Sequence, residues 1–464
     1  MKREPVVIVG AGLVGALLGT LLAQRGFAVT LFERRPDPRK AGFIGGRSIN
    51  LALAERGWHG LRLAGLAQTL RPLAVMMRGR MVHHVDGHTE LLRYGRDDTE
   101  VIWSISRGAL NMALLDAAEA AGARIHFDQG LREVNWEKST LQFFDETGTL
   151  REHIAPLVIG ADGAGSALRA AMGKQADLGE RFKPLDHGYK ELEIPPIDSL
   201  PPRAGEAVRR TEGGKFALEP NALHIWPRGN YMCIALPNSE GSFTVTLFMP
   251  NAGNPSFTTV DSATAAHALF ARDFADALPL IPQLEHDYAH NPTGILGTLY
   301  LDRWHLGGSA LLLGDAAHAL VPFHGQGMNC GFEDAVELAQ LLGDSRDDTE
   351  STFAEFERRR KPNADAIAAM ALENYIEMRD SVADAHFLLM RDVGRVLAER
   401  HLGRFVPRYG MVTFTRMPYC VAFARGKIQT GILRELCEGK TTLDQIDLTH
   451  ADRLIGERLA PLPN

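Results

Sequence analysis

Cysteine is scarce in this chain, and the few cysteines lie far apart. The 464 residues contain Cys233, Cys330, Cys420 and Cys437, with no CxxC pair among them. This spacing excludes a disulfide framework and a cysteine-rich metal site. The 17 histidines also lack an HExxH pattern or another paired ligand spacing, so we predict no metal. Such cysteine usage is typical of the reducing cytoplasm, where we expect the protein.

A strong charge of one sign is also missing. Fifty basic residues face 57 acidic residues, and the net charge of -7 predicts no attraction to nucleic acid or an anionic membrane. Residues 6–23 form an uncharged run that imitates an anchor, but Gly10, Gly12 and Gly15 interrupt it. No other run reaches spanning length. We therefore expect no membrane association and a small-molecule partner, and the oligomeric state stays open.

The N-terminal segment has the pattern of a βαβ unit. Residues 6–9 are a β-branched run typical of a strand buried on both faces. Residues 13–25 favour a helix and residues 28–33 a second strand. The unit spans about 30 residues, the size of a dinucleotide-binding half.

The loop inside this unit carries a phosphate-binding pattern. Gly10 permits a tight turn, Gly12 lets the backbone approach a pyrophosphate, and Gly15 allows close packing of the helix that begins at Leu13. Glu33 follows Gly12 by 21 residues and is placed to accept hydrogen bonds from a ribose. The alternative is a glycine-rich turn beside an exposed acid. The pattern predicts a dinucleotide, and by itself it leaves FAD and NAD open.

The rest of the chain changes pattern twice. Residues 111–121 favour a helix, and residues 124–127 and 157–160 favour strands. Between about 186 and 289, alternation such as Phe243, Val245 and Leu247 is typical of antiparallel sheet. From residue 333 onward the pattern is helical, with breaks expected near Pro362, Pro407 and Pro418.

These patterns predict an α/β fold in which a Rossmann-like FAD-binding domain is interrupted by a mostly antiparallel sheet domain and followed by a helical C-terminal region. The expected boundaries are 1–72, 101–185 and 290–378 for the FAD-binding domain, 73–100 and 186–289 for the substrate domain, and 379–464 for the helical region.

Two further motifs resemble the flavoprotein aromatic hydroxylases. They are Gly160-Ala161-Asp162-Gly163 with Ser166 and Arg169, and Gly314-Asp315-Ala316-Ala317-His318. Each alone could be a turn in which Asp caps a helix. Together with the glycine loop, in this order, they favour FAD. The wider class often has Pro after the His of the last motif, where this chain has Ala319.

That resemblance implies the rest of the flavin site. It places Asp315 at the ribityl region and a helix N-terminus against the isoalloxazine, where backbone donors stabilise negative charge on reduced flavin. The loop concerned contains Gly325, Gln326, Gly327, Met328 and Asn329. The chain has no second strand-led glycine fingerprint, which matches a class in which the nicotinamide docks transiently.

A narrower resemblance covers nearly the whole chain. The sequence resembles the bacterial kynurenine 3-monooxygenases in the segments 46–53, 76–81, 94–107, 187–189, 223–227, 322–329, 373–378 and 407–409. The resemblance implies a monooxygenase that binds FAD, consumes NADPH and O2, and hydroxylates L-kynurenine to 3-hydroxykynurenine through a flavin hydroperoxide. Preference for NADPH over NADH stays open.

The resemblance also implies a substrate site. Arg80, Tyr94, Asn374 and Tyr409 would hold the amino-acid end of the substrate, because a guanidinium can donate two charge-assisted hydrogen bonds to a carboxylate. From the residues alone, a solvated Arg and an exposed Asn are the more common readings. Asn374 and Met378 are four apart and share one helical face.

Phe323 and His324 are predicted to form the wall against the aromatic ring. His324 is a candidate base, but a lone His more often packs or donates a hydrogen bond. The aniline nitrogen of kynurenine already activates the ortho carbon, so the catalytic residue is left unassigned.

The resemblance adds Arg34, Ala52, Arg107 and Leu131 to the flavin site. Arg107 would reach a phosphate or ribose, and a salt bridge at a helix end is the competing reading. Three alternatives to the proposed reaction remain: hydroxylation of another aromatic acid, reduction of an isoprenoid chain, and a flavin-binding protein without turnover.

Overall fold

We analysed a computed structural model of the chain. It describes residues 5–41, 50–145, 147–201, 214–344, 348–377 and 385–462. Residues 46–49 of the first resemblance segment and Met378 lie outside the described residues.

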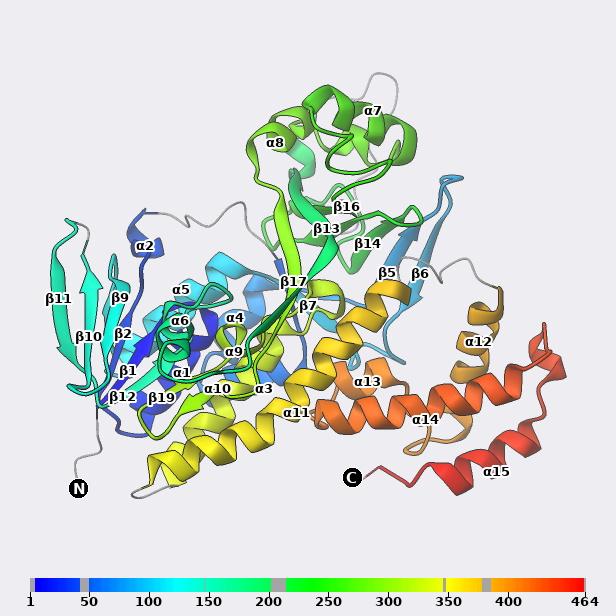
Figure 1. Cartoon of the computed structure of the whole chain (residues 1–464). Coiled ribbons are helices and arrows are strands. Elements are labelled where there is room, and N and C mark those ends of the chain that lie inside the picture. The colour runs from blue at the N-terminus through cyan, green and yellow to red at the C-terminus, as the bar shows by residue number, and fades with distance from the viewer. Residues whose placement is uncertain are drawn as a thin grey trace.

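A six-stranded sheet forms one half of the structure (Figure 1). Its order is β18 (His305–Leu306), β19 (Ala310–Leu312), β12 (Leu157–Gly160), β1 (Val6–Val9), β2 (Val29–Phe32) and β8 (Arg124–His126). All pairs are parallel except β18 with β19. Every residue of β1 is buried, as a strand covered on both faces requires.

Helices α1 (Leu13–Gln24), α5 (Arg107–Ala120) and α10 (Gly327–Asp344) pack with this sheet into the largest apolar core. The helix expected at 111–121 begins four residues earlier than predicted. Its start is set by Ser106, whose hydroxyl accepts a hydrogen bond from the backbone N–H of Ala109. A serine N-cap satisfies one of the free amides of the first turn.

The structure also contains a seven-stranded sheet. Its order is β17 (Gly294–Tyr300), β13 (Arg181–Ile194), β16 (Phe243–Pro250), β15 (Met232–Pro237), β14 (Ala222–Pro227), β5 (Gly79–His83) and β6 (Thr89–Arg93). Only β14 with β5 is parallel among these pairs. Phe243, Val245 and Leu247 point into a core shared with α7 (Ala263–Asp273) and α8 (Leu284–His290), which lie above the sheet in Figure 1.

The two sheets draw strands from distant parts of the chain. Strand β13 begins before residue 186, and β17 lies after residue 289. Two three-stranded sheets complete the strands: β11 (Leu150–Ile154), β10 (Thr140–Phe144) and β9 (Gly130–Asn135), and β3 (Asn50–Leu53), β7 (Ile102–Ser106) and β4 (Ala74–Met77).

The C-terminal part is helical. It contains α11 (Thr349–Ile376), α12 (Ala385–Arg400), α13 (Arg408–Thr413), α14 (Tyr419–Cys437), the 3-10 turn η6 (Leu443–Gln445) and α15 (Leu448–Arg458). Pro407 and Pro418 directly precede α13 and α14, as predicted. The break predicted at Pro362 is wrong, because Pro362 lies inside α11. A proline removes one helical hydrogen bond, and buried neighbours such as Phe356 and Ile367 keep the helix packed on both sides of it.

The remaining short elements are α2 (Pro38–Ala41), α3 (Glu55–Leu63), α4 (Ala67–Leu70), η1 (Arg71–Leu73), α6 (Ala167–Gly173), η2 (Ile197–Ser199), η3 (Leu278–Leu280), α9 (Asp315–His318) and η4 (Pro322–His324). Among the described residues, no helix combines the length and apolar character needed to cross a membrane.

Candidate functional site

A cavity opens where the glycine loop meets the second strand. Its lining consists of Ala11, Gly12, Glu33, Arg35, Pro36, Pro38, Asn111, Leu115 and Phe127. The cavity lies beyond the carboxyl ends of β1 and β2, where open α/β sheets bind nucleotides.

The backbone of the loop is shaped for an anion. Gly10 has φ +99°, and a Cβ there would stand 2.5 Å from the carbonyl oxygen of Ala161, so no larger residue fits. A Cβ on Gly12 would meet nothing within 4 Å. No described side chain caps α1 at Gly12, and its first turn has no acidic residue. Free amides facing open space fit a pyrophosphate.

Glu33 braces this loop from the end of β2. Its Oε2 accepts a hydrogen bond from the N–H of Ala11 over 3.0 Å, and its Oε1 accepts one from the N–H of Arg35 over 3.0 Å. The carboxylate still borders the cavity, as a ribose-binding acid must. Asn111, which the sequence analysis missed, donates to the carbonyl of Ala11 over 3.1 Å; nothing in its local sequence distinguishes it.

The second motif caps a helix and supports the third motif. Asp162 accepts hydrogen bonds from the Ser166 hydroxyl at 2.6 Å and the Ala167 amide at 2.7 Å, so the capping alternative describes its contacts. Arg169 donates to the carbonyl of Ala316 over 3.0 Å. This bond joins the second motif to α9. Asp315 begins α9 and is exposed, free to meet a ligand.

The loop after α9 is built around Asn329. Gly325 adopts a left-handed φ of +66° between η4 and α10. The Asn329 side chain is fully buried; its amide donates to the carbonyls of Ala52 at 2.8 Å and Gly325 at 3.0 Å, and its Oδ1 accepts from the N–H of Ala54 at 2.9 Å. The predicted flavin residues Ala52, Gly325 and Asn329 therefore form one cluster.

The start of α10 follows directly. Gly327 and Met328 are the first two residues of the helix and are partly exposed, whereas the side chain of Gln326 is buried against α14. The backbone amides of Gly327 and Met328 are the groups that this turn presents outward.

A buried ion-pair network underlies the third motif. Asp334 on α10 accepts hydrogen bonds from His318 at 2.6 Å, Arg360 at 2.7 Å and the Gly314 amide at 3.0 Å. Burial alone would raise the pKa of Asp334, but the charges of His318 and Arg360 bring it to about 2.

Metal binding at this network is disfavoured. His318, Cys330 and Asp334 are close enough to hold an ion. However, Arg360 already occupies Asp334, and burial raises the pKa of the Cys330 thiol well above its usual range. A protonated thiol is not a metal ligand.

Four of the predicted substrate residues come together at the other end of the flavin loop. The ring of Tyr409 stacks on Tyr94 at 5.3 Å and on His324 at 5.7 Å between centroids. Cζ of Arg80 lies 5.7 Å from the Tyr94 ring centroid and 5.8 Å from that of Tyr409. Strand β5, the residue after β6, and α13 thus place a cation beside two stacked phenol rings.

Electrostatics keep this cation charged. Burial would lower the pKa of Arg80, but the two tyrosines and Glu377 raise it. Burial also raises the pKa values of Tyr94 and Tyr409, so both phenols stay protonated. The cluster presents a charged guanidinium beside two neutral phenols, which suits a carboxylate.

Phe323 and Asn374 lie at the adjoining wall. The amide of Asn374 on α11 donates to the carbonyl of Phe323, so the side chain predicted to touch substrate also holds the turn. The Phe323 ring packs against Tyr375 at 4.6 Å and Phe248 at 5.1 Å.

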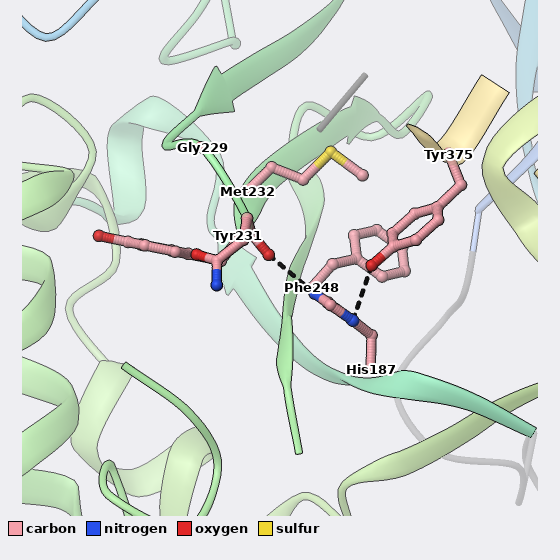
Figure 2. A pocket seen from close by; sticks show the side chains of 7 residues that line it. His187, Gly229, Tyr231, Met232, Phe248 and Tyr375 are labelled. Atoms are coloured by element: carbon pink, nitrogen blue, oxygen red, sulfur yellow. Dashed lines mark hydrogen bonds between the residues drawn. The ribbon is translucent and has the colours of Figure 1, made fainter. Parts of the chain in front are cut away.

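Behind this wall is a small cavity bordered by His187, Met232, Phe248 and Tyr375 (Figure 2). His187 donates through Nε2 to the carbonyl of Asn230 over 2.8 Å, which leaves Nδ1 to accept from the Tyr375 hydroxyl over 2.7 Å. The pair locks Tyr375 against Phe323.

His324 is a poor base at neutral pH. Burial lowers its pKa to about 4, and its buried Nδ1 has no hydrogen-bond partner among the described residues. The His324 ring stacks on Tyr409, and among the described residues no side chain emerges as the catalytic acid or base.

The last predicted flavin contacts lie at the rim. Arg34 is exposed, and its Cβ lies 3.7 Å from the position of a Cβ built on Gly130. Leu131 follows Gly130 in β9 and packs on the apolar core around the six-stranded sheet. Arg107 is exposed at the start of α5, and its positive charge lowers the pKa of Glu191 on β13. Burial raises the pKa of Glu191 to about 7, against the charge of Arg107.

Comparison with known proteins places the chain in a family. Residues 3–371 match a family described as FAD binding domain. The chain is 56% identical to the kynurenine 3-monooxygenase of Xanthomonas axonopodis pv. citri over 100% of its own length and 98% of the relative. It is also 56% identical to that of Xanthomonas campestris pv. campestris, over 98% of this chain and 97% of the relative.

Solved structures share the fold. A 2-methyl-3-hydroxypyridine-5-carboxylic acid oxygenase superposes with a TM-score of 0.63 at 22% identity, over 83% of this chain and 95% of that one. PqsL of Pseudomonas aeruginosa, in complex with 2-aminobenzoylacetate, gives 0.63 at 20% identity, over 81% and 96%. The predicted fold class is confirmed.

Proposed function

Because this chain belongs to the kynurenine 3-monooxygenase family of FAD-binding proteins, we propose that it hydroxylates L-kynurenine to 3-hydroxykynurenine with NADPH and O2. The observation that carries the proposal is the Arg80 cluster. It places a half-buried cation beside two protonated phenols and an aromatic wall. This matches a substrate that has a carboxylate at one end and an aromatic ring at the other.

Each residue of the cluster has a role in the proposal. Arg80 donates to the substrate carboxylate, and the Tyr94 and Tyr409 hydroxyls complete its hydrogen bonds. Asn374 is assigned to the same end of the substrate, and its amide holds Phe323. Phe323 and His324 flank the aromatic ring and exclude water.

Bound FAD would supply the redox chemistry and the activation of O2. The Gly10–Gly15 loop and Glu33 would hold its ADP half, with Arg34 and Leu131 at the rim. Asp315, Arg107 and the residues 325–329 with Ala52 would hold the ribityl and ring half. The open space before Gly12 and the exposed Asp315 support this assignment.

The alternatives fit less well. An isoprenoid reductase needs a long apolar tunnel, and a charged Arg80 at the pocket end disfavours an apolar chain. A protein without turnover has no use for the stacked wall of Tyr94, Tyr409 and His324. We also propose a cytoplasmic location, supported by four free cysteines, three of them buried.

The decisive experiment is product identification after incubation with kynurenine, NADPH and O2. We expect 3-hydroxykynurenine, with NADPH oxidation that accelerates when kynurenine is present. Flavin-containing protein that oxidises NADPH no faster with kynurenine, or yields only hydrogen peroxide, would refute the proposal.

Arg80→Ala tests the carboxylate assignment. Loss of a charge-assisted hydrogen bond costs about 1.5–3 kcal/mol, so KM for kynurenine should rise about 10- to 100-fold. The matched control is Arg78→Ala, two residues away, where the guanidinium pairs with the exposed Asp98. Equal KM values in the two variants would contradict the assignment.

A further inference from the structure

Two buried histidines touch each other on the face of the seven-stranded sheet opposite Arg80. His83 of β5 and His224 of β14 are only 6% and 2% exposed. His83 Nε2 lies 2.9 Å from His224 Nδ1. The outer nitrogens also have partners: His83 Nδ1 lies 2.7 Å from Asp276 Oδ2, and His224 Nε2 lies 2.8 Å from the carbonyl oxygen of Glu219.

The partners determine how many protons the pair holds. A carbonyl oxygen and an ionised carboxylate only accept hydrogen bonds, so both outer nitrogens must carry hydrogen. The central contact between His83 and His224 needs one further hydrogen. Two imidazoles therefore share three protons and one positive charge, whereas two neutral imidazoles would hold two.

Asp276 is ionised in this arrangement. Its side chain is 43% exposed, and it accepts hydrogen bonds from the Trp226 indole N–H at 2.9 and 3.0 Å. Burial raises the pKa of Asp276, but His83 and Trp226 bring it below its usual value. Burial lowers the pKa of His224 to about 3. His83 is the ring that contacts the Asp276 carboxylate.

The other charged groups around the pair already have hydrogen-bond partners of their own. Arg228 donates to the backbone carbonyl of His83 at 3.0 Å and to that of Asp273 at 2.6 Å. The Asp273 carboxylate pairs with Arg272 and accepts from Tyr231. Burial raises the pKa of the nearby Cys233 thiol, which stays neutral. The one direct counter-ion of the shared proton among the described residues is Asp276.

We propose that the His83–His224 pair is a positioning device for Arg80: its shared proton bonds strand β5 to β14 and charges the link from His83 to Asp276 in the helical cap (α7, η3 and α8), and substrate affinity falls when that proton is lost at alkaline pH. Side chains alternate along a strand, so Arg80 and His83, three residues apart, lie on opposite faces. Arg80 faces the rings of Tyr94 and Tyr409, while His83 reaches Asp276, which lies between α7 and η3.

The position of β5 explains why it needs this fastening. It is next to the edge of the sheet, with only β6 beyond it, and on its inner side Leu223 pairs with Arg80 and His224 with Met81. Without the shared proton, the lone pairs of His83 Nε2 and His224 Nδ1 face each other across the central contact. Since the arrangement needs one proton more than two neutral imidazoles hold, its contribution is present at lower pH and is lost as pH rises.

The proton count is tested without any substitution. In the FAD-loaded full-length enzyme labelled with 15N-histidine, we expect three N–H groups on the two rings at pH 7, assigned with His83→Gln and His224→Gln. Two N–H groups would overturn the proposal. This readout does not involve kynurenine, so it is independent of the proposed reaction, on which the positioning role rests.

The positioning role is tested with Asp276→Asn, which keeps the shape and removes the counter-ion. The control is Asp273→Asn in the same cap. We expect Asp276→Asn to lose the third ring proton at neutral pH and to raise KM for kynurenine about tenfold with kcat nearly unchanged. The wild type should show the same rise in KM only at higher pH. If KM and its pH profile are the same in both variants, Arg80 is not positioned by this pair.

Discussion

The hydroxyl of Tyr419 donates a hydrogen bond to Oε1 of Gln326 over 2.9 Å, fully inside the protein. Tyr419 begins helix α14, and Gln326 precedes the helix whose first amides are proposed to face the flavin. Cζ of Arg56 lies 3.9 Å above the Tyr419 ring and its guanidinium donates to the carbonyls of Val412 and Met417. The C-terminal helices are therefore bonded to the flavin loop and do more than cover it.

Tyr419→Phe should weaken FAD binding. The variant leaves the Gln326 oxygen buried and unsatisfied, at a cost of about 1–3 kcal/mol. If the loop takes up this cost, the Kd for FAD rises about 5- to 100-fold, measured by flavin fluorescence. Tyr288→Phe is the control, since that hydroxyl donates to Val260 in the cap at 2.6 Å. A FAD affinity that falls equally in both variants would show that the effect is general.

Asp334→Asn should destabilise the fold strongly. It leaves Arg360 buried without its closest carboxylate, and breaking a buried ion pair costs about 3–5 kcal/mol. Glu337 lies on the same helix as Asp334, and Glu337→Gln breaks its half-exposed pair with Arg359 of α11. This change should cost less than about 1 kcal/mol. Urea unfolding of the two variants gives the comparison. Similar midpoints would mean that the network around Asp334 adds no net stability.

Gly12→Ala should fold normally and bind FAD poorly. Gly12 has φ -68° and open space at its Cβ position, so thermal stability without FAD should match wild type. The methyl occupies the space in front of α1, and we expect the Kd for FAD to rise about tenfold or more. Gly173→Ala, at another open position, is the control. Unchanged flavin affinity in Gly12→Ala would place the pyrophosphate elsewhere.

Glu191→Gln should stabilise the protein at alkaline pH. Burial raises the pKa of Glu191 to about 7, above about 4.3 for an unfolded Glu. Between these values the folded state binds more protons, so its stability falls as pH rises. The Gln variant avoids this loss, and its Tm should exceed that of wild type by about 1–2 °C at pH 8 and by almost nothing at pH 4. Glu133→Gln, on the exposed strand β9, should show no such pH dependence.

Local features were predictable from the sequence for a physical reason. The strand at 6–9, the turn at Gly10 and the helix from Leu13 depend on hydrophobic spacing and on backbone conformations that only glycine tolerates. The helix break predicted at Pro362 does not occur, because buried residues on both sides of Pro362 keep α11 packed. Packing overrides a local penalty. The predicted start of α5 lies four residues too late, because the helix is capped by Ser106 and begins at Arg107.

By itself, then, the amino-acid sequence determined the dinucleotide loop, the alternation of the antiparallel sheet and, through resemblance, the residues of the pocket. Tertiary structure decided that Arg80 lies beside the stacked rings of Tyr94 and Tyr409, that Asn374 holds Phe323, and that His83 and His224 on neighbouring strands come within 2.9 Å of each other. These relations join residues far apart in the chain. They depend on which acceptor each donor meets, and no local pattern of residues encodes that choice.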